Sequence, residues 1–496
     1  MMRKTERRTR TDSSGVVYHR RLKSLAPTMT PYSRQLELLR AERTRWAGRF
    51  RHLILKGTEE FVRLAGQELD KPRHETITAE LLPLVASCRW HQRQARRILR
   101  TRRLKGRPIW LLGQQHRIQH APLGTVGIIA TWNYPIQLLG IQLLQAAIPG
   151  NDVVVKPSEH APETQAFLLD LARKAGLEES ALRWLPATRE AGADMIEHQA
   201  LDHLVFTGST RVGRLVAEAC ASRLLPSTLE LSGRDSALVL ADADAELAAR
   251  SIWNAVTSNA GQTCMAPRRV LVHQDRYQAF CDALIPLAEK AIPRRLTLPE
   301  DAERIESQID QATEHGGRSF PSGSVVSNPS AFIPRAVLDC PADAPLMEGD
   351  HFGPALAVSA CQTLDEMLQR HHAVGQYLAT SIWTRDQSAA RGMAAELQSA
   401  TVTINDVLVP TAHPAASISG HGLSGWGTSR GAAGLLSMSR PVHVTTTPRK
   451  MRVPTDVPTD ASLAKLERLI GVRRPSAEDT DTITRNSSHP HSGKSS

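Results

Sequence analysis

The sequence has few cysteines, few aromatic residues and no long apolar run. Its 496 residues include six cysteines, none in a CxxC motif or at a Cys/His spacing typical of metal ligands. We therefore expect neither a disulfide framework nor a metal site. We also expect the protein to be located in a reducing compartment, the cytoplasm. The longest stretch without a charged residue, 118–151, contains prolines, an asparagine and glutamines, so we expect no membrane span.

What is present is an ordinary globular composition with a basic excess. The chain is 41% apolar and 22% charged, with 61 Lys and Arg against 50 Asp and Glu, for a formal net charge of +11. The length predicts two to four domains. Segments 1–24, 89–107 and 449–496 carry net charges of +6, +9 and +3, so the remaining chain is mildly acidic. A basic helical run is more typical of a solvated face than of a nucleic-acid site, so we expect no nucleic-acid partner.

The apolar periodicity predicts an α/β fold. Helices are predicted over 31–72 and 74–103, followed by a hairpin over 108–120. From about 125 to 241 strands and helices alternate, which is typical of parallel sheets with helical crossovers. The predicted strands are 125–131, 152–156, 202–206 and 236–241, and the predicted helices are 136–148, 162–175 and 211–222. Beyond 449 the composition predicts a disordered tail with one short helix, 462–470.

Two residues are candidates for covalent chemistry. Cys264 ends the segment Ser-Asn-Ala-Gly-Gln-Thr-Cys, and a cysteine thiolate is a strong nucleophile. Glu230 lies 34 residues earlier in the strand-like segment Leu-Glu-Leu-Ser-Gly, and a carboxylate in apolar surroundings suits a general base. Each residue alone has an ordinary alternative explanation, an inert buried thiol and a surface glutamate at a strand end.

Three further segments have the residues of a nucleotide site. Phe206-Thr-Gly-Ser-Thr-Arg-Val-Gly213 follows a predicted strand and opens a predicted helix, whose free N–H groups can face a diphosphate. Trp132-Asn133-Tyr-Pro follows another strand, and an asparagine amide can donate to an oxyanion. Lys156-Pro-Ser158-Glu159 follows the next strand and can bind ribose hydroxyls. Taken singly, these segments are also typical of loops and helix caps.

The order and spacing of these motifs resemble the aldehyde dehydrogenase superfamily over roughly residues 30–448. WNYP, VVVKPSE, FTGSTRVG, LELSG and NAGQTC occur in the family's order, followed by Phe352-Gly-Pro and a late Ser-Gly-Trp-Gly loop. The segment PLGTVGIIATWNYP with KPSE is most similar to the coniferyl and fatty aldehyde type. The resemblance implies a Rossmann-type cofactor domain, an α/β catalytic domain and a small β oligomerisation arm.

The resemblance also implies roles for individual residues. Cys264 attacks an aldehyde, Asn133 and the Cys264 backbone N–H hold the oxyanion, and Glu230 activates the water that hydrolyses the thioester to a carboxylic acid. A carboxylate at the ribose, Glu159, favours NAD, with NADP as the alternative. The expected cofactor-binding residues are Trp132, Lys156, Ser158, Glu159, Gly208, Ser209, Gly213, Asp350 and Phe352.

Three positions depart from the family pattern. Ser232 replaces a glycine, and if this position requires positive φ a serine costs about 1 kcal/mol. Asp350 is one methylene shorter than the usual glutamate, and the late loop reads Ser417-Ile-Ser-Gly420. Two alternatives therefore stay open: a catalytically impaired member that acts as a binding or scaffold protein, and a CoA-acylating aldehyde dehydrogenase.

The resemblance sets the expected domain boundaries. We expect a cofactor domain in 25–107 and 122–229, a catalytic domain in 230–410, and an arm formed by 108–121 and 411–448. Residues 1–24 are expected to be a disordered basic arm and 449–496 a disordered tail. Exposed strand edges in the β arm favour a homodimer, with a tetramer second. The aromatic content of 4% does not indicate which aldehyde is the substrate.

Overall fold

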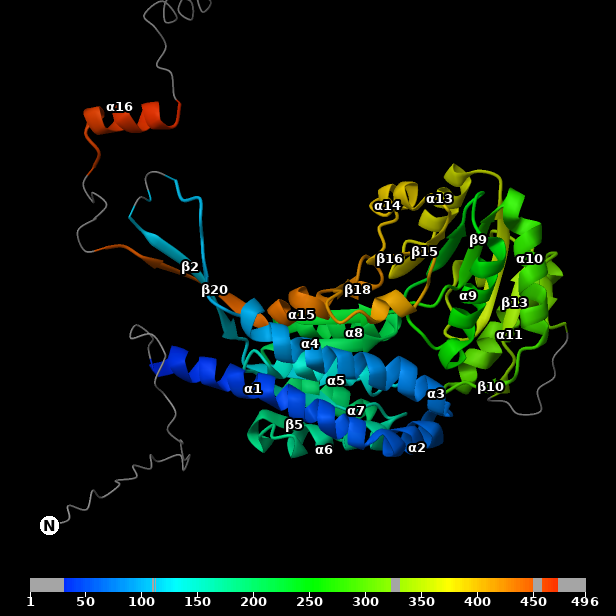
Figure 1. Cartoon of the computed structure of the whole chain (residues 1–496), viewed down its shortest axis with the longest axis horizontal. Coiled ribbons are helices and arrows are strands. Elements are labelled where there is room, and N and C mark those ends of the chain that lie inside the picture. Colours follow the sequence, from blue (N-terminus) through cyan, green and yellow to red (C-terminus); the bar gives the residue numbers. More distant parts are fainter. Residues whose placement is uncertain (1–30, 109–110, 112, 323–330, 449–456, 472–496) are drawn as a thin grey trace, which may run out of the picture. The chain divides into compact units, whose positions relative to one another are not determined.

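The computed structural model describes residues 31–108, 111, 113–322, 331–448 and 457–471 (Figure 1). The predicted basic arm, 1–24, lies outside the described residues, as does most of the predicted tail, 449–496. The chain divides into two compact units. The first comprises the described residues up to Thr101 and those from Gln119 to Val442, and the second comprises Arg102–Ile118 and the described residues from His443 onward.

A six-stranded sheet in the first unit has the order β18-β7-β6-β3-β4-β5. β3 to β7 run parallel, and β18 lies antiparallel to β7. The chain starts in the middle of the sheet at β3, adds β4 and β5 on one side, then crosses to add β6 and β7 on the other. The bounds are β3 Thr125–Ile129, β4 Asp152–Lys156, β5 Leu182–Trp184, β6 His203–Gly208, β7 Ser227–Leu231 and β18 Gly425–Trp426.

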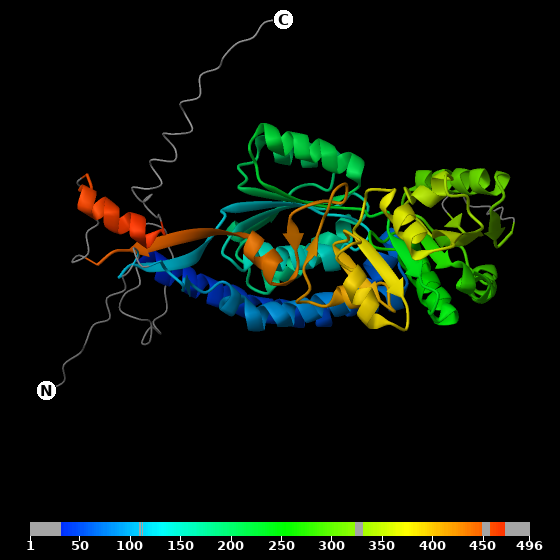
Figure 2. The same ribbon diagram turned by 90° about the horizontal axis from the view of Figure 1, so that it is seen from above.

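Helices lie on both faces of this sheet (Figure 2). Alternating side chains of its strands pack against these helices. Val126 and Ile128 pack in a cluster with α1, α4, α5 and α6, whereas Leu204 and Phe206 pack with α7 and α8. This period of two, with both faces apolar, is typical of a buried parallel sheet. The helix bounds are α1 Pro31–Lys56, α2 Thr58–Leu69, α3 Arg73–Glu75, η1 Thr76–Leu81, α4 Leu82–Ile98, α5 Gln137–Ala147, α6 Pro162–Lys174, α7 Arg189–His198, α8 Thr210–Ser222 and α15 Gly431–Ser437.

A second, seven-stranded sheet has the order β11-β13-β14-β9-β8-β15-β16, with only β11 antiparallel. Its strands are β8 Ser236–Val239, β9 Arg269–His273, β11 Arg318–Phe320, β13 Arg335–Leu338, β14 Ala355–Cys361, β15 Ala379–Trp383 and β16 Thr401–Ile404. Its helices are α9 Ala245–Thr257, α10 Gln274–Glu289, α11 Pro299–Glu314, α12 Pro345–Glu348, α13 Leu364–His372 and α14 Gln387–Met393. The remaining elements are η3 Glu179–Ala181, η4 Ser258–Gly261, η5 Val409–Ala412, and the short strands β10 Arg294–Arg295, β12 Ala331–Phe332, β17 Ile418–Ser419 and β19 Thr428–Ser429.

The first two predicted helices are wrong in their bounds. The helix predicted over 31–72 is two helices, because Gly57 separates α1 from α2. The helix predicted over 74–103 begins near the predicted residue but ends at Ile98. Thr101, Arg102 and Arg103 are all exposed, so no apolar side chain holds a further helical turn against the core.

A three-stranded sheet, β1-β2-β20, extends into the second unit. Its strands are β1 Arg102–Arg103, β2 Gln115–Pro122 and β20 Ser439–Thr446. The pairing predicted for the hairpin over 108–120 is wrong, because β2 pairs with β1 and β20. Residues 109, 110 and 112 of its predicted first strand lie outside the described residues. The short helix α16, Asp460–Leu469, confirms the helix predicted within the tail. Among the described helices, none combines the length and the apolar character that crossing a membrane requires.

Candidate active site

The predicted site residues gather at one edge of the six-stranded sheet. β3, β4, β6 and β7 are parallel neighbours, and their carboxyl ends lead into Trp132-Asn133, Lys156-Pro-Ser-Glu159, Gly208-Ser209 and Glu230. The strand order reverses between β3 and β6, since the chain builds the sheet outward in both directions from these two strands. In open α/β sheets such a point leaves a crevice at the carboxyl ends where ligands bind.

The turn from β6 into α8 has the form of a phosphate-binding turn. Ser209 caps α8, its Oγ accepting a hydrogen bond from Val212 N at 3.3 Å. The other amides of the first helical turn have no acceptor within the helix and are available to an anion. A Cβ on Gly213 would lie 2.5 Å from the Leu231 side chain, so this glycine permits the close packing of α8 on β7. These residues fit the diphosphate of a dinucleotide.

A buried lysine and a carboxylate lie at the end of β4. Lys156 is 4% exposed and its Nζ lies 2.9 Å from Oε2 of Glu159. Partial burial raises the pKa of Glu159, but the hydrogen bonds from Lys156 and its own backbone, with help from Arg189, lower it to about 2. Ser158 is buried, and its Oγ accepts from His160 N at 3.2 Å. Glu159 is therefore ionised and held in place at the crevice.

The segment before Cys264 has an unusual backbone. Asn259, Ala260 and Gly261 have φ values of 52°, 53° and 70°, so three consecutive residues are left-handed. A Cβ on Gly261 would lie 2.3 Å from the backbone of Gly353, so only glycine fits here. Strained backbone of this kind is concentrated at functional sites. Cys264 follows this turn and is partly exposed, whereas the other five cysteines are buried.

Asn133 contacts the Cys264 segment directly. Its Nδ2 donates to Gln262 O at 3.0 Å, and its carbonyl accepts from Asn259 Nδ2 at 2.9 Å. The Tyr134 hydroxyl lies 2.6 Å from Thr263 Oγ1, next to the cysteine. The structure therefore brings the loop after β3 against the cysteine segment, residues about 130 apart in the sequence.

A buried ion pair that the sequence did not indicate supports this loop. Lys71 and Glu80 have side chains only 1% and 0% exposed and are joined by a hydrogen bond. Lys71 Nζ also donates to Asn133 O at 2.8 Å, and Glu80 Oε2 accepts from two backbone amides, those of Ile136 and Gln137, each at 2.9 Å. The pair thus fixes both sides of the turn that carries Asn133.

Glu230 lies in β7, and one of its two carboxylate oxygens has no hydrogen-bond partner. Its Oε2 accepts from Gln142 Nε2 and Thr207 Oγ1, each at 3.3 Å, whereas the buried Oε1 has no hydrogen-bond partner. Three residues later, Gly233 N donates to the Cys264 carbonyl at 3.2 Å. The carboxylate and the thiol are therefore on adjoining segments, and Glu230 has an acceptor available for a water molecule.

The expected strain at Ser232 does not arise. Ser232 does not have a positive φ, so the cost considered for a serine in place of glycine is absent. Its carbonyl accepts from Ser424 Oγ at 3.1 Å and from Gln376 Nε2. Two side chains from distant parts of the sequence thus hold the backbone at the serine.

The residues around Phe352 complete the predicted set. The rings of Trp132 and Phe352 meet edge to face with centroids 5.7 Å apart. Asp350 is exposed and pairs with Arg234 at 3.1 Å, so its carboxylate is held beside the loop that follows Glu230. The structure therefore places the predicted residues from the second half of the chain next to those from the first.

Buried charges surround Cys264. Burial raises the pKa of the Cys264 thiol to about 11, with Asp235 and Glu230 raising it further and Arg430 and Arg268 opposing them. Arg268 is fully buried and donates to the carbonyls of Gly261 and Thr263 at 2.9 and 2.8 Å. Sequence reasoning missed Asp235, Arg268 and Arg430, since their charged side chains follow no periodic pattern that marks them as buried.

The raised pKa of the buried Asp235 carboxyl leads us to expect a specific pH dependence of stability. Burial raises its pKa to about 7, although amides of Ala379 and Leu378 lower it, whereas an aspartate in an unfolded chain has a pKa of about 3.9. Between these values the folded protein retains a proton that unfolding releases, so stability falls as pH rises, by up to about 1.4 kcal/mol per pH unit. Asp235→Asn should remove this slope, as measured by urea unfolding of both proteins at pH 5 to 8. A stability difference that stays constant over this range would contradict the prediction.

The described residues contain no cluster of His, Cys, Asp or Glu that could hold a metal ion. Two surface grooves lie elsewhere, along α1 and α4, and neither includes a residue of the candidate site. We place the site by the convergence of reactive side chains and not by surface shape.

Known proteins share this fold and sequence pattern. Residues 37–444 match the model of the aldehyde dehydrogenase family. A 4,4'-diapolycopene aldehyde oxidase from Methylomonas is 30% identical over 79% of this chain and 75% of its own length, and a probable coniferyl aldehyde dehydrogenase from Caulobacter vibrioides is 31% identical over 66% and 70%. The NAD+ complex of an aldehyde dehydrogenase from Bacillus cereus superimposes with a TM-score of 0.78 at 25% identity, covering 85% of this chain and 86% of that one. These matches confirm the predicted α/β fold class, and the chain belongs to the aldehyde dehydrogenase family.

Proposed function

We propose that this protein oxidises an aldehyde to a carboxylic acid with NAD, through a covalent intermediate on Cys264. The observation that carries the proposal is the contact of the Asn133 loop with the Cys264 segment beside Glu230. A nucleophile, an amide donor and a carboxylate with an unused oxygen are the groups that this reaction requires.

The proposed reaction uses these residues in sequence. The Cys264 sulfur attacks the aldehyde carbon, its thiol proton passes to solvent water, and a thiohemiacetal forms with its oxyanion held by Asn133 Nδ2 and the Cys264 N–H. The bound nicotinamide supplies the hydride acceptor for the oxidation of this adduct to a thioester. Glu230 then takes a proton from water, which attacks the thioester and releases the acid and the thiol.

The proposed cofactor site is the crevice at the switch point. Gly208, Ser209 and Gly213 border the diphosphate at the α8 N-terminus, and Lys156 and Glu159 bind the adenosine ribose, with Ser158 beside them. A carboxylate at that ribose repels a 2′-phosphate, so Glu159 favours NAD over NADP. Trp132 and Phe352, whose rings are in contact, would hold the nicotinamide end of a bound cofactor, and Asp350 would bind its second ribose.

Assay of the purified protein tests this proposal. With NAD and a panel of aliphatic and aromatic aldehydes we expect NADH formation and the carboxylic acid as product, unaffected by CoA. Formation of an acyl-CoA would favour the acylating alternative, in which Glu230 has no water to activate. The absence of NADH formation with every aldehyde, for a protein that still binds NAD, would contradict oxidation by this site and favour the scaffold alternative.

We further propose the domain division stated above and a cytoplasmic homodimer. The exposed edges of the β1-β2-β20 sheet, β1 and β20, support the pairing of this sheet with a second subunit. Sedimentation velocity at micromolar concentration should give a dimer, and a stable monomer would contradict the role of the sheet.

A further inference from the structure

A row of arginines lies on one exposed face of α4. Arg89, Arg93, Arg96 and Arg97 are all exposed and are spaced by four, three and one residues, which places them on one side of the helix. They extend over about 12 Å of the helix axis. The sequence from 81 to 151 contains no aspartate or glutamate, so no acidic residue near them in the sequence offsets their charge.

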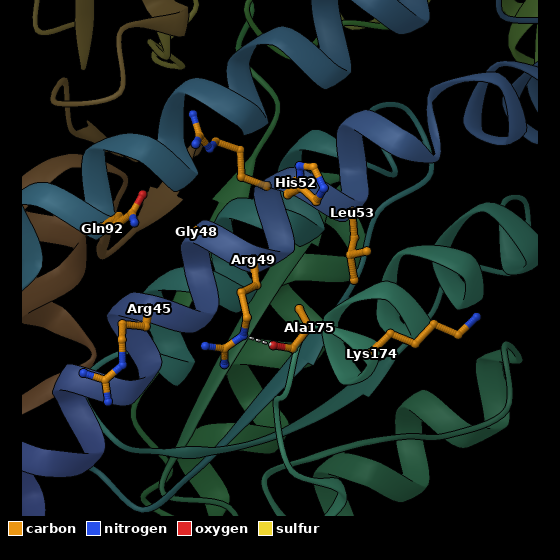
Figure 3. Close-up of a pocket in the computed structure, with 9 residues that line it drawn as sticks. Arg45, Gly48, Arg49, His52, Leu53, Gln92, Lys174 and Ala175 are labelled. Atoms are coloured by element: carbon orange, nitrogen blue, oxygen red, sulfur yellow. Dashed lines mark hydrogen bonds between the residues drawn. The ribbon is translucent and has the colours of Figure 1, made fainter. Parts of the chain in front are cut away.

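These four arginines form no ion pair with any described residue. Arg45 and Arg49 of α1 line a neighbouring groove between α1, α4 and α6 (Figure 3). There Arg49 donates to Ala175 O at 2.6 Å and pairs with Glu42, which also pairs with Arg45. Two arginines of α1 thus share one carboxylate partner, whereas the four arginines of α4 have none among the described residues.

A groove of about 560 Å³ continues the arginine row. Trp90 lines it together with Arg89 and Arg93 of α4 and Arg51 of α1. Trp90 is only partly buried, and Arg51 Nε is buried without a hydrogen-bond partner. The groove therefore combines a partly exposed aromatic ring with three guanidinium groups, and in one of these, that of Arg51, Nε has no hydrogen-bond partner.

Contrary to the expectation from the sequence alone, we propose that this arginine face, made of Arg51, Arg89, Arg93, Arg96 and Arg97 with Trp90, binds single-stranded nucleic acid. Guanidinium groups bind phosphate oxygens in bidentate geometry, and 12 Å is the length of about three to four phosphates at helical spacing. Single strands present unstacked bases, which stack on aromatic side chains in basic grooves. A duplex buries these ring faces, so Trp90 favours the single strand.

Two other occupants fit the arginine face less well. An anionic membrane binds amphipathic helices through a row of apolar side chains that enter the lipid, yet Leu82 is the one large aliphatic residue of α4 that is exposed. A second copy of this chain in a twofold interface would place the arginine rows against each other, and like charges repel.

Titration of labelled oligonucleotides tests the proposal in the full chain. Fluorescence anisotropy with a 20-nucleotide single-stranded RNA, at salt concentrations from 50 to 200 mM, gives both the Kd and its salt dependence. The triple variant R93Q/R96Q/R97Q removes three charges from the arginine face. We expect its Kd to rise about tenfold or more and the slope of log Kd against log salt to fall by about 2, since each phosphate contact contributes about 0.7.

A matched variant controls for net charge. R45Q/R63Q/R250Q also removes three exposed helical arginines, each paired with a carboxylate on its own helix. We expect it to bind RNA as the natural chain does, whereas equal weakening by both triple variants would overturn the proposal. Unchanged melting temperatures in both variants would show that binding, and not folding, is compared.

Separate experiments test the role of the Trp90 ring and the two alternative occupants, a membrane and a second copy of the chain. Trp90→Ala should weaken RNA binding about tenfold, the effect of one lost stacked base, while the salt slope stays the same. Stronger binding to vesicles of phosphatidylserine and phosphatidylcholine than to RNA would overturn the proposal in favour of a membrane. It would also be overturned if R93Q/R96Q/R97Q changed only the sedimentation of the protein and not its RNA binding.

Discussion

Replacing Cys264 with alanine should reduce NAD-dependent aldehyde oxidation by about 10⁴-fold or more, because no other group can take over the covalent step. The same change should abolish hydrolysis of activated esters, which needs the nucleophile but no cofactor. Both activities are measured spectrophotometrically on purified protein, and residual turnover above a hundredth of the natural rate would contradict the role of Cys264.

The other cysteines provide the control for this experiment. Cys340 is 2% exposed within the apolar core of the seven-stranded sheet, so Cys340→Ala removes a thiol without touching the site. It should keep the activity of the natural chain. Because five of the six cysteines are buried, iodoacetamide should label the native protein once, at Cys264, and mass spectrometry identifies the labelled peptide.

Replacing Glu230 with glutamine should separate the two halves of the reaction. The thioester should still form, giving a burst of one NADH per subunit, while steady-state turnover falls about 10²- to 10⁴-fold because no base activates the water. Stopped-flow absorbance measures the burst, and intact-protein mass spectrometry should show the acyl group retained on the variant. Loss of the burst itself would assign Glu230 to an earlier step.

A surface glutamate provides the matched change for Glu230. Glu396 is exposed after α14, and Glu396→Gln makes the same chemical substitution far along the chain. It should leave both the burst and the steady-state rate unchanged. A comparable loss of turnover in this variant would indicate that the assay responds to net charge and not to the base.

Local pattern predicted the regular part of the fold well. The strand over 152–156 has the predicted bounds, and the helix predicted over 162–175 differs by one residue, because apolar side chains recur there with a clear period. The apolar pattern was misleading where tertiary contacts determine the secondary structure. Arg102 and Arg103 read as the end of a helix, yet they pair with β2, a contact that no local window contains.

Residues of the candidate site could be predicted only where a short sequence motif contains them. Asn133, Glu230 and Cys264 follow from short segments, and the structure brings those segments together. The Lys71–Glu80 pair and the buried Asp235 and Arg268 were not predicted, because a charged residue in a sequence normally indicates a solvent-exposed position. Their burial is compensated by hydrogen bonds to backbone groups. For Lys71, Glu80 and Asp235 these groups lie 56 to 144 residues away in the chain, where sequence spacing gives no sign of them.

The buried Lys71–Glu80 pair has a consequence for the order in which the protein acquires its site during synthesis. Asn133 and its turn are held by residues 62 positions or fewer before them, all in the first third of the chain. Their contacts with Asn259 and Gln262 are made 126 to 129 residues later. The residues that hold the Asn133 turn are therefore all translated before the cysteine segment, which supplies the second oxyanion donor, the Cys264 N–H, and the last contacts of the turn.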